Sequence, residues 1–355
     1  MPTALDLAPL TRPLPPSAVQ AYRDAARRLG APWAQANASQ ILGIAFGALG
    51  GAIAVIVFGG LAASTTLGAI RDGSPVGVVF GLFFIGVPVL AAVVVVRRLL
   101  RSGGRWGRWA RIAAFAEANG LDFAPQARVP GYPGLIFGLG SDRTVGEHVS
   151  TRSGRFIDMG GYEYTTGSGK NRTTHHWSFL AIRLDRRLPN IVLDSRQNNG
   201  VLGATNLPVA LARDQVLHLE GDFDRYFTLY CPKDYETDAL YVFTPDLMAL
   251  LIDEAAPFDV EIVDDWFFAY SSRALDMAEP ATYRRLFRIV DTVGAKAAHQ
   301  TERYRDDRVA GAIAANVVAP QGARLRHGAS IGAVVGIVVV IAWIGWSFVS
   351  RIAGF

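Results

Sequence analysis

Three long uncharged runs constrain what this chain can fold into more than any other feature. They cover residues 41–63, 75–96 and 329–349, and none contains Asp, Glu, Lys or Arg. Because an α-helix rises about 1.5 Å per residue, about 20 apolar residues cross a hydrocarbon core about 30 Å thick. Buried helices of globular proteins are usually shorter than these runs. The sequence therefore predicts three transmembrane helices.

The placement of arginine predicts how these helices thread the bilayer. The segment 1–40 and the long stretch 97–328 are rich in arginine, whereas the loop 64–74 and the tail 350–355 carry one arginine each. Cytoplasmic loops carry an excess of Lys and Arg. We therefore expect a multi-pass protein of the plasma (cell) membrane, with its N-terminus and residues 97–328 in the cytoplasm and its C-terminus outside.

The runs also divide the chain into parts of different composition. A proline-rich start precedes a short amphipathic helix predicted at 18–29, with Ser17 as its N-cap. The predicted parts are a cytoplasmic N-terminal segment (1–40), transmembrane helix 1 (41–63), an outer loop (64–74), transmembrane helix 2 (75–96), a basic juxtamembrane segment (97–111), a cytoplasmic α+β domain (112–300), a linker helix (301–328), transmembrane helix 3 (329–349) and an outer tail (350–355).

The basic juxtamembrane segment predicts a lipid partner. Each basic residue near an anionic leaflet contributes about 1 kcal/mol of attraction. Arginines interleaved with Trp106 and Trp109 are also ingredients of nucleic-acid sites, but the position beside a predicted span favours the bilayer, and no nucleic acid is expected. The residues predicted to contact anionic headgroups are Arg97, Arg98, Arg101, Arg105, Arg108 and Arg111.

Glycines four residues apart recur in each uncharged run. Small residues at that spacing share one helix face and let helices approach closely. This predicts packing within a three-helix bundle or, as the alternative, a homo-oligomer. Because ionisable residues usually mark ion and proton pathways, their absence from the runs disfavours a transporter or channel. The glycines are Gly43, Gly47 and Gly51, Gly77 and Gly81, and Gly332 and Gly336.

The stretch 121–272 changes to short strands separated by Gly and Pro. Apolar residues in 177–184 point to both faces, which predicts a strand buried on both sides. Asp264-Asp265 between the apolar stretches 258–263 and 266–271 predicts a hairpin. The expected fold class is a polytopic α-helical membrane protein with a cytoplasmic α+β domain on an antiparallel or mixed sheet. Further strands are predicted at 155–161, 190–194, 216–219, 227–230 and 240–243, helices at 112–119, 244–254 and 280–308, and a polar loop at 165–176.

Charge is unevenly distributed within this domain. Residues 214–300 hold 7 basic and 17 acidic groups, a net charge of −10, whereas residues 112–213 have a net charge of +3. The acidic half should face away from an anionic leaflet. Solvated acidic loops explain most of this charge. Its acids include Asp222, Asp224, Asp234, Glu236 and Asp238, which lack the glycine and the terminal glutamate of a calcium loop.

Residues that suggest chemistry do not form a recognisable site. The fragment 166–170 lacks the first glycine of a phosphate loop, where Tyr164 stands, and a strand rather than a helix follows it. His175 and His176 are adjacent, so on a strand they point to opposite faces and do not chelate one ion. Cys231 is the single cysteine and is predicted to be a packing thiol. We assign no catalytic, cofactor-binding or metal residues and expect no cofactor.

The stretch 221–271 carries a resemblance to a known family. Its pattern is Phe223-x3-Phe227-x-Leu229-Tyr230, followed by Asp238-Ala239-x-Tyr241-x-Phe243-Thr244-Pro245-x-Leu247-Met248. This resembles a bacterial membrane-associated domain family of unknown function whose members carry two N-terminal spans. A composition of 32 arginines and 3 lysines is typical of an actinobacterial genome. The family has no established catalytic residue, and the third uncharged run departs from its usual layout.

Function is therefore predicted only by class. The first hypothesis is a membrane-tethered scaffold or protein-interaction module, because no catalytic set accompanies the dipolar domain. The alternative is a membrane-bound enzyme acting on a lipid or envelope precursor, with acids of the 214–300 half or His175 and His176 as its groups. A third hypothesis is a ligand-sensing domain, which requires a cavity.

Overall fold

The computed structural model describes residues 5–34, 60, 64, 66–68, 70–75, 104–128, 130–200, 205–219, 221–302, 304–309 and 316–328. The chain divides into two compact units. One comprises Ala8–Ala114, and the other, the α+β unit, comprises Met1–Leu7 and Phe115–Phe355. Each unit is described by itself.

The predicted fold class needs correction. Among the described residues, no helix has both the length and the apolar character that a membrane crossing requires. The expected polytopic architecture with three transmembrane helices is thus wrong for the part of the chain that the structure describes, which is an α+β fold on a seven-stranded antiparallel sheet. Except for Gly60 and Pro75, the residues of the three predicted spans lie outside the described residues.

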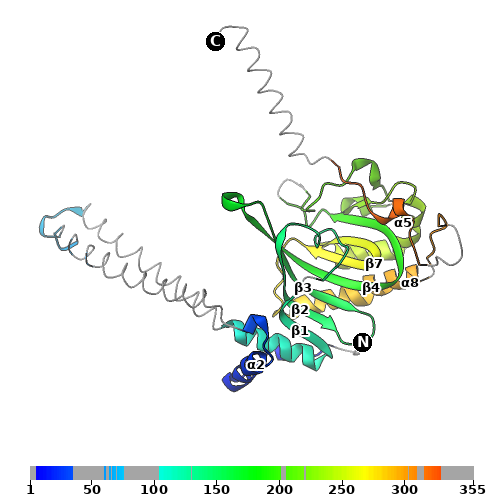
Figure 1. Ribbon diagram of the computed structural model, residues 1–355. Helices are drawn as coiled ribbons and strands as arrows, with labels where there is room; N and C mark the ends of the chain where they lie inside the picture. The colour runs from blue at the N-terminus through cyan, green and yellow to red at the C-terminus, as the bar shows by residue number, and fades with distance from the viewer. Residues whose placement is uncertain are drawn as a thin grey trace, which may run out of the picture. The chain divides into compact units, whose positions relative to one another are not determined.

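The sheet of the α+β unit has the order β1-β2-β3-β4-β6-β5, with β7 pairing to β4 (Figure 1). All of its pairs are antiparallel. The strands are β1 (Leu121–Ala127), β2 (Ser141–Thr151), β3 (Ile157–Thr166), β4 (Thr173–Ser195), β5 (Val216–Leu217), β6 (Phe227–Tyr230) and β7 (Asp259–Ser271).

Strand β4 is the central strand of the sheet. It pairs with β3 near its start, with β6 near its end, and with β7 along most of its length. Residues 177–182 are all buried, which confirms the prediction of a strand covered on both faces. The predicted strands 177–184 and 190–194 are parts of this one strand, and the predicted polar loop 165–176 is only the short turn after Thr166.

The predicted hairpin at 258–271 is wrong. Its two stretches belong to the single strand β7 and pair with β4 rather than with each other. Asp264 has a φ of +51°, and the register between β4 and β7 shifts on either side of it. Such bulges bend a strand. Figure 1 shows β4 and β7 curving together. The two stretches of β7 therefore bend toward one another but form no hydrogen-bonded pair with each other.

Helices contribute a second layer to the α+β unit. Where the π-helix η7 (Val290–Gly294) passes into α8 (Ala295–Thr301), a Cβ added at Gly294 would lie 2.6 Å from Ile182 Cδ1 of β4. A larger residue here would require the Ile182 side chain to shift. The other helices are α5 (Glu236–Val242), α6 (Pro245–Leu250), the π-helix η6 (Leu251–Ala255), α7 (Pro280–Ile289) and α9 (Pro320–Ala323), with short 3-10 turns at η2 (Gly169–Asn171), η4 (Arg213–Gln215) and η5 (Phe223–Arg225).

These helices confirm some predictions and correct others. The helix predicted at 244–254 is α6 with η6, and Pro245 stands in its first turn, where proline is favoured. The helix predicted at 280–308 begins at Pro280 but ends at Thr301. The predicted strand 240–243 is wrong, because most of it belongs to α5.

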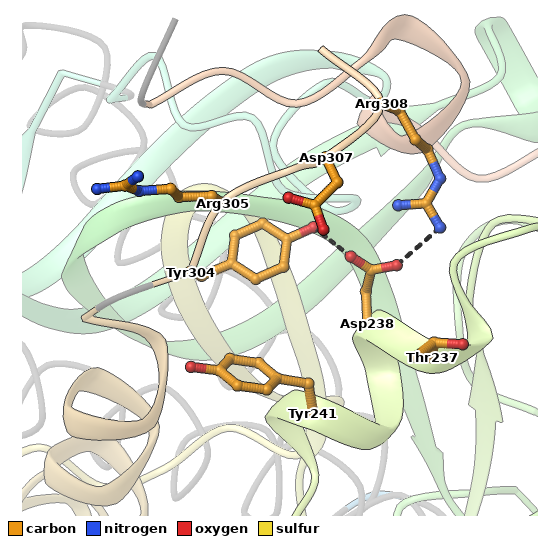
Figure 2. Close-up of a pocket in the computed structure, with 7 residues that line it drawn as sticks. All are labelled: Thr237, Asp238, Tyr241, Tyr304, Arg305, Asp307 and Arg308. Atoms are coloured by element: carbon orange, nitrogen blue, oxygen red, sulfur yellow. Dashed lines mark hydrogen bonds and ion pairs between the residues drawn. The ribbon is translucent and has the colours of Figure 1, made fainter. Parts of the chain in front are cut away.

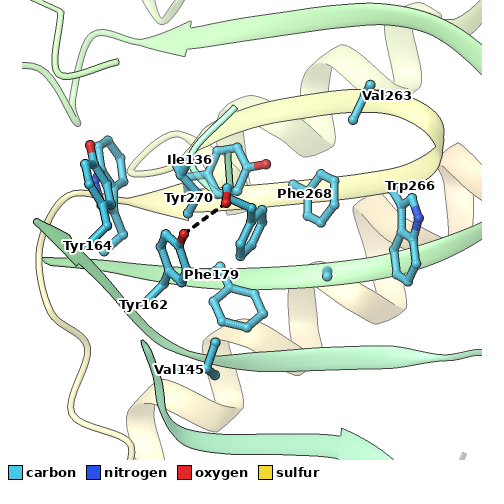
Figure 3. Close-up of a cluster of buried hydrophobic side chains, with 12 residues drawn as sticks. Ile136, Val145, Tyr162, Tyr164, Phe179, Val263, Trp266, Phe268 and Tyr270 are labelled. Carbon is cyan, nitrogen blue, oxygen red and sulfur yellow. Dashed lines mark hydrogen bonds between the residues drawn. The ribbon is translucent and has the colours of Figure 1, made fainter. Parts of the chain in front are cut away.

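An aromatic cluster fills the inside of the bent sheet (Figure 3). The segment 130–137, which we call the strap, contributes Ile136 and Phe137 to it. Three hydrogen bonds hold the strap. Tyr132 donates to Asp158 Oδ2 at 2.5 Å, the Leu135 amide donates to Glu261 Oε2 at 2.7 Å, and Tyr162 donates to the Phe137 carbonyl at 3.1 Å. The other cluster members are Val145, Tyr162, Tyr164, Trp177, Phe179, Ala181, Val263, Trp266, Phe268 and Tyr270.

Glu261 is the buried centre of this anchorage. Besides the Leu135 amide it accepts hydrogen bonds from Tyr270 Oη at 2.9 Å and Asn190 Nδ2 at 3.1 Å. Burial raises the pKa of Glu261 to about 7, although these hydrogen bonds favour its charged form. A buried carboxyl group therefore holds the strap, although burial disfavours its charged form.

The unit Ala8–Ala114 is small and partly described. It holds α1 (Ala8–Thr11), α2 (Pro16–Arg28), the 3-10 turn η1 (Pro32–Ala34) and helical residues at 104–114. Rings of Tyr22, Trp33, Trp106 and Trp109 lie with neighbouring centroids 5.5–6.3 Å apart. Helix α2 confirms the helix predicted at 18–29, but its N-cap is Pro15 rather than Ser17.

The predicted basic juxtamembrane segment is described only from residue 104. The Arg105 guanidinium lies 4.8 Å from the centroid of the Trp109 ring, and Arg111 donates to the Leu10 carbonyl at 3.3 Å. Arg97, Arg98 and Arg101 lie outside the described residues. Binding of anionic headgroups by this segment stays a prediction.

Candidate functional site

A polar pocket lies beside α5 in the α+β unit. It has a volume of about 660 Å³ and is open to solvent. One side comes from α5 and the other from the segment 304–308, which follows α8 (Figure 2). We call it the α5 pocket. Its lining residues are Thr237, Asp238, Tyr241, Tyr304, Arg305, Asp307 and Arg308.

Asp238 links the two sides of the α5 pocket. Tyr304 donates to Asp238 Oδ1 at 2.7 Å, and Arg308 Nη2 lies 2.9 Å from Asp238 Oδ2. Burial and the Asp238 carboxylate raise the pKa of Tyr304, so its phenol stays protonated as a donor. Burial alone would lower the pKa of Arg308, but Asp238 raises it. The carboxylate, the phenol and the guanidinium are therefore fixed in one arrangement.

Asp306 supports this arrangement from behind. It is buried and accepts from Tyr235 Oη at 2.7 Å and from the Ala319 amide at 2.8 Å, while Arg308 Nη1 lies 3.3 Å away. Burial would raise the pKa of Asp306, but these hydrogen bonds outweigh it and lower the pKa. The group is ionised at neutral pH and holds Arg308 from a second side.

An aromatic corner forms the open part of the α5 pocket. The rings of Tyr241 and Tyr304 have centroids 6.3 Å apart and are tilted by 42°. Tyr304 is buried, whereas Tyr241 is 43% exposed and the adjacent Leu240 is 53% exposed. An exposed aromatic and an exposed leucine next to a fixed charged pair are features of docking sites.

The geometry around Asp238 does not favour proton transfer. Both oxygens of Asp238 are already engaged, one by a phenol and one by a guanidinium. A general base needs a free position within hydrogen-bond reach of the proton it removes. Asp238 is thus better suited to holding a ligand than to acting as a general base.

A second cluster joins β2, β3 and the strap. The β2–β3 register shifts between Gly146 and Val149, and Glu147 there has a φ of +46°. His148, which follows Glu147, lies with Nε2 2.6 Å from Asp158 Oδ1, and Tyr132 occupies the other oxygen. Bulges commonly redirect a side chain. Because Asp158 holds the strap, we assign this cluster to fastening it.

The other residues considered from the sequence are held apart. His175 Nε2 lies 2.8 Å from Thr166 Oγ1, whereas His176 Nδ1 lies 2.9 Å from Glu163 Oε1. The fragment 166–170 forms the β3–β4 turn, so it has no phosphate-loop geometry. Burial raises the pKa of Cys231 to about 12, which keeps the thiol protonated.

The acids considered for calcium binding do not converge. Asp224 Oδ2 lies 2.7 Å from His218 Nδ1, whereas Asp238 lines the α5 pocket. Within the described residues, no group of three or more His, Cys, Asp or Glu side chains is placed to hold a metal ion.

Sequence reasoning missed the α5 pocket. Asp238 was considered in the acidic cluster and in the family-like pattern and Tyr241 only in that pattern, whereas Tyr304 and Arg308 were not considered as site residues. The first half of that pattern does form core, since Phe223 and Phe227 are buried and their rings stack 5.2 Å apart. The sequence carried no signal that Leu240 and Tyr241 are exposed, because the stretch 240–243 is uniformly apolar.

Comparisons with known proteins do not identify a family. No family model and no curated protein matches the chain. Among solved structures, the chain is similar to the mycobacterial trehalose monomycolate transport factor A, TtfA, with a TM-score of 0.37 and 11% identity over 54% of this chain and 94% of that one. A TM-score this low supports no conclusion. The resemblance to a bacterial membrane-associated family stays a prediction.

Proposed function

We propose that the α+β unit is a protein-interaction module whose docking site is the α5 pocket together with Leu240. The observation that carries this proposal is the half-exposed Tyr241 in a pocket where Asp238, Tyr304 and Arg308 are already fixed, next to the exposed Leu240 on the same helix. Preorganised sites lose less entropy on binding. Tyrosine and arginine are also the side chains most often found to dominate binding energy.

The charged groups favour binding over catalysis. Asp238, Tyr304 and Arg308 are tied to one another, and Asp306 adds a buried support. Such a network presents a constant surface, whereas general acid–base catalysis needs a group that changes its protonation state. The enzyme hypothesis named acids of the 214–300 half or His175 and His176 as its groups, and its histidine version loses support because each histidine has a separate partner.

Photo-crosslinking from the pocket mouth tests the proposal. A benzoylphenylalanine placed at position 241 of the full-length protein, in cells of the source organism, should give a discrete covalent adduct with another protein. The matched control is position 156, because Phe156 is also aromatic and is 39% exposed, close to the 43% of Tyr241. In the 241 variant, Leu240→Ala should reduce the adduct about tenfold, the effect of losing an important contact.

Two outcomes would contradict the module. One is the absence of an adduct from position 241. The other is the same pattern of adducts from positions 241 and 156, since that would reflect general surface encounters.

A further inference from the structure

We propose that the α5 pocket receives a cationic side chain, a lysine or arginine of the partner protein. This inference rests on the proposed function and names the chemistry of the group that docks. It begins from the two tyrosine walls of the pocket, one of which is largely open to solvent. The face of an aromatic ring attracts a cation within about 6 Å of its centroid.

The chain already holds one cation in this manner next to the pocket. The Arg308 guanidinium lies 4.0 Å from the centroid of the Tyr235 ring. Asp238 and Asp306 contact it from two sides, at 2.9 Å and 3.3 Å. An aromatic face with flanking carboxylates therefore binds a guanidinium in this part of the fold. The open corner of Tyr241 and Tyr304 offers the same combination to an incoming group.

Asp307 supplies the carboxylate for that group. It is exposed, lines the pocket and makes no hydrogen bond or ion pair with another described residue. In Figure 2 the side chains of Asp238 and Asp307 point toward each other, whereas Arg305 points away from them. A cation between the tyrosines would thus meet an unpaired carboxylate with the opposite charge.

The arginines of the pocket do not cancel this preference. Arg308 is compensated by two carboxylates, so the group of Asp238, Asp306 and Arg308 has a net charge of −1. Asp307 and Arg305 carry one charge each, of opposite sign, so together they do not change the net charge of the pocket. The stretch 214–300, which contains α5, has a net charge of −10, which favours the approach of a basic partner.

A set of three peptides tests the class of ligand. The probes are fluorescein-labelled nonapeptides of Gly, Ser and one Leu that differ at two positions, carrying Lys, Gln or Glu. With full-length protein at low salt, fluorescence anisotropy should show the Lys peptide binding at least fivefold more tightly than the Gln peptide, and the Glu peptide more weakly still. Raising the salt concentration should weaken only the Lys peptide, because exposed charge pairs are screened.

Variants separate a specific pocket from general attraction. Asp307→Asn should weaken the Lys peptide about three- to tenfold, as expected from losing an ion pair next to a cation–π contact. Asp291→Asn is the matched control, because Asp291 is an exposed acid on η7 outside the pocket lining, and it should change binding less than twofold.

Equal binding of the Lys and Gln peptides, or equal effects of the two substitutions, would overturn the cation proposal. The interaction module would still stand if position 241 gives a specific adduct. Failure of the adduct would reject the module itself, so the two experiments fail separately.

Discussion

Gly134→Ala is expected to lower the free energy of unfolding of the α+β unit by about 3 kcal/mol, at the upper end of the cost of overpacking a core. A Cβ at this position would lie 2.0 Å from Tyr270 Oη and 3.1 Å from two ring carbons of Phe268. Tyr270 has no room to withdraw, because it is fully buried and its hydroxyl donates to Glu261. The substitution should therefore push the strap off the aromatic cluster.

Urea unfolding followed by tryptophan fluorescence measures this loss. Gly131→Ala is the matched control within the same strap, since a Cβ there would meet nothing within 4 Å. It should change stability by less than about 0.5 kcal/mol, as for other surface substitutions. Adding Tyr270→Phe to Gly134→Ala should recover part of the loss, because it removes the oxygen in the way. Similar midpoints for the two glycine variants would show that the strap is not tightly packed.

The second large expected effect is a loss of stability as the pH rises from about 4.5 to about 7. In the folded state Glu261 has a pKa of about 7, against 4.5 for its usual value. The folded protein therefore binds this proton more tightly than the unfolded chain does. Stability is greatest below the unfolded pKa and falls as the pH passes through the folded pKa. Glu261 alone contributes about 3 kcal/mol to this fall.

Two further acids change the stability in the same direction as the pH rises. Burial raises the pKa of Asp259 to about 7 and that of Asp194 to about 6. Asp259 accepts from the Ser195 amide at 2.8 Å and from Asn198 at 2.6 Å. All three groups favour the folded state at pH 5 over pH 8, so their effects act in one direction.

The variant Glu261→Gln measures how much of this pH dependence of stability comes from Glu261. The variant is expected to be less stable at pH 5, because the amide nitrogen would face the Asn190 donor, but it should lose about 3 kcal/mol less between pH 5 and pH 8 than the wild type. Glu279→Gln, at an exposed glutamate, should leave the pH dependence unchanged. A Glu261→Gln curve parallel to that of the wild type would mean that Glu261 keeps its ordinary pKa in the fold.

The sequence predicted those elements whose cause is local. Residues 177–184 show apolar side chains on both faces, and β4 is buried on both faces there. Pro245 and Pro280 mark helix starts that α6 and α7 confirm. Gly120, directly after the helix predicted at 112–119, has a φ of +67°, the conformation that a glycine adopts at a helix end. Local backbone preference is enough in these cases.

Elements decided by distant pairing were not predictable in this way. Asp264-Asp265 has the composition of a hairpin turn, but the partner of both flanking stretches is β4, which is far away in sequence. Residues 240–243 are all apolar, so their sequence shows no alternation of polar and apolar residues that would distinguish a helix from a strand. Burial of Tyr235, Ala239 and Val242 shows the helical spacing only once the fold is known.

The candidate site likewise joins residues that are far apart in the sequence. Asp238 and Tyr304 are separated by 66 residues, so no motif contains both. Their pairing follows from the path of the chain after α8, which hydropathy does not reveal. Hydropathy also produced the polytopic fold class, which the described residues do not support.

The continuity of β4 limits where this protein could be divided. Strands β3, β6 and β7 are all hydrogen-bonded to it, so a cut inside 173–195 would divide the one strand that joins them. The β3–β4 turn is different, because residues 167–172 are exposed and lie outside the ladder. A split reporter or an inserted tag should be accommodated at that turn and rejected a few residues later.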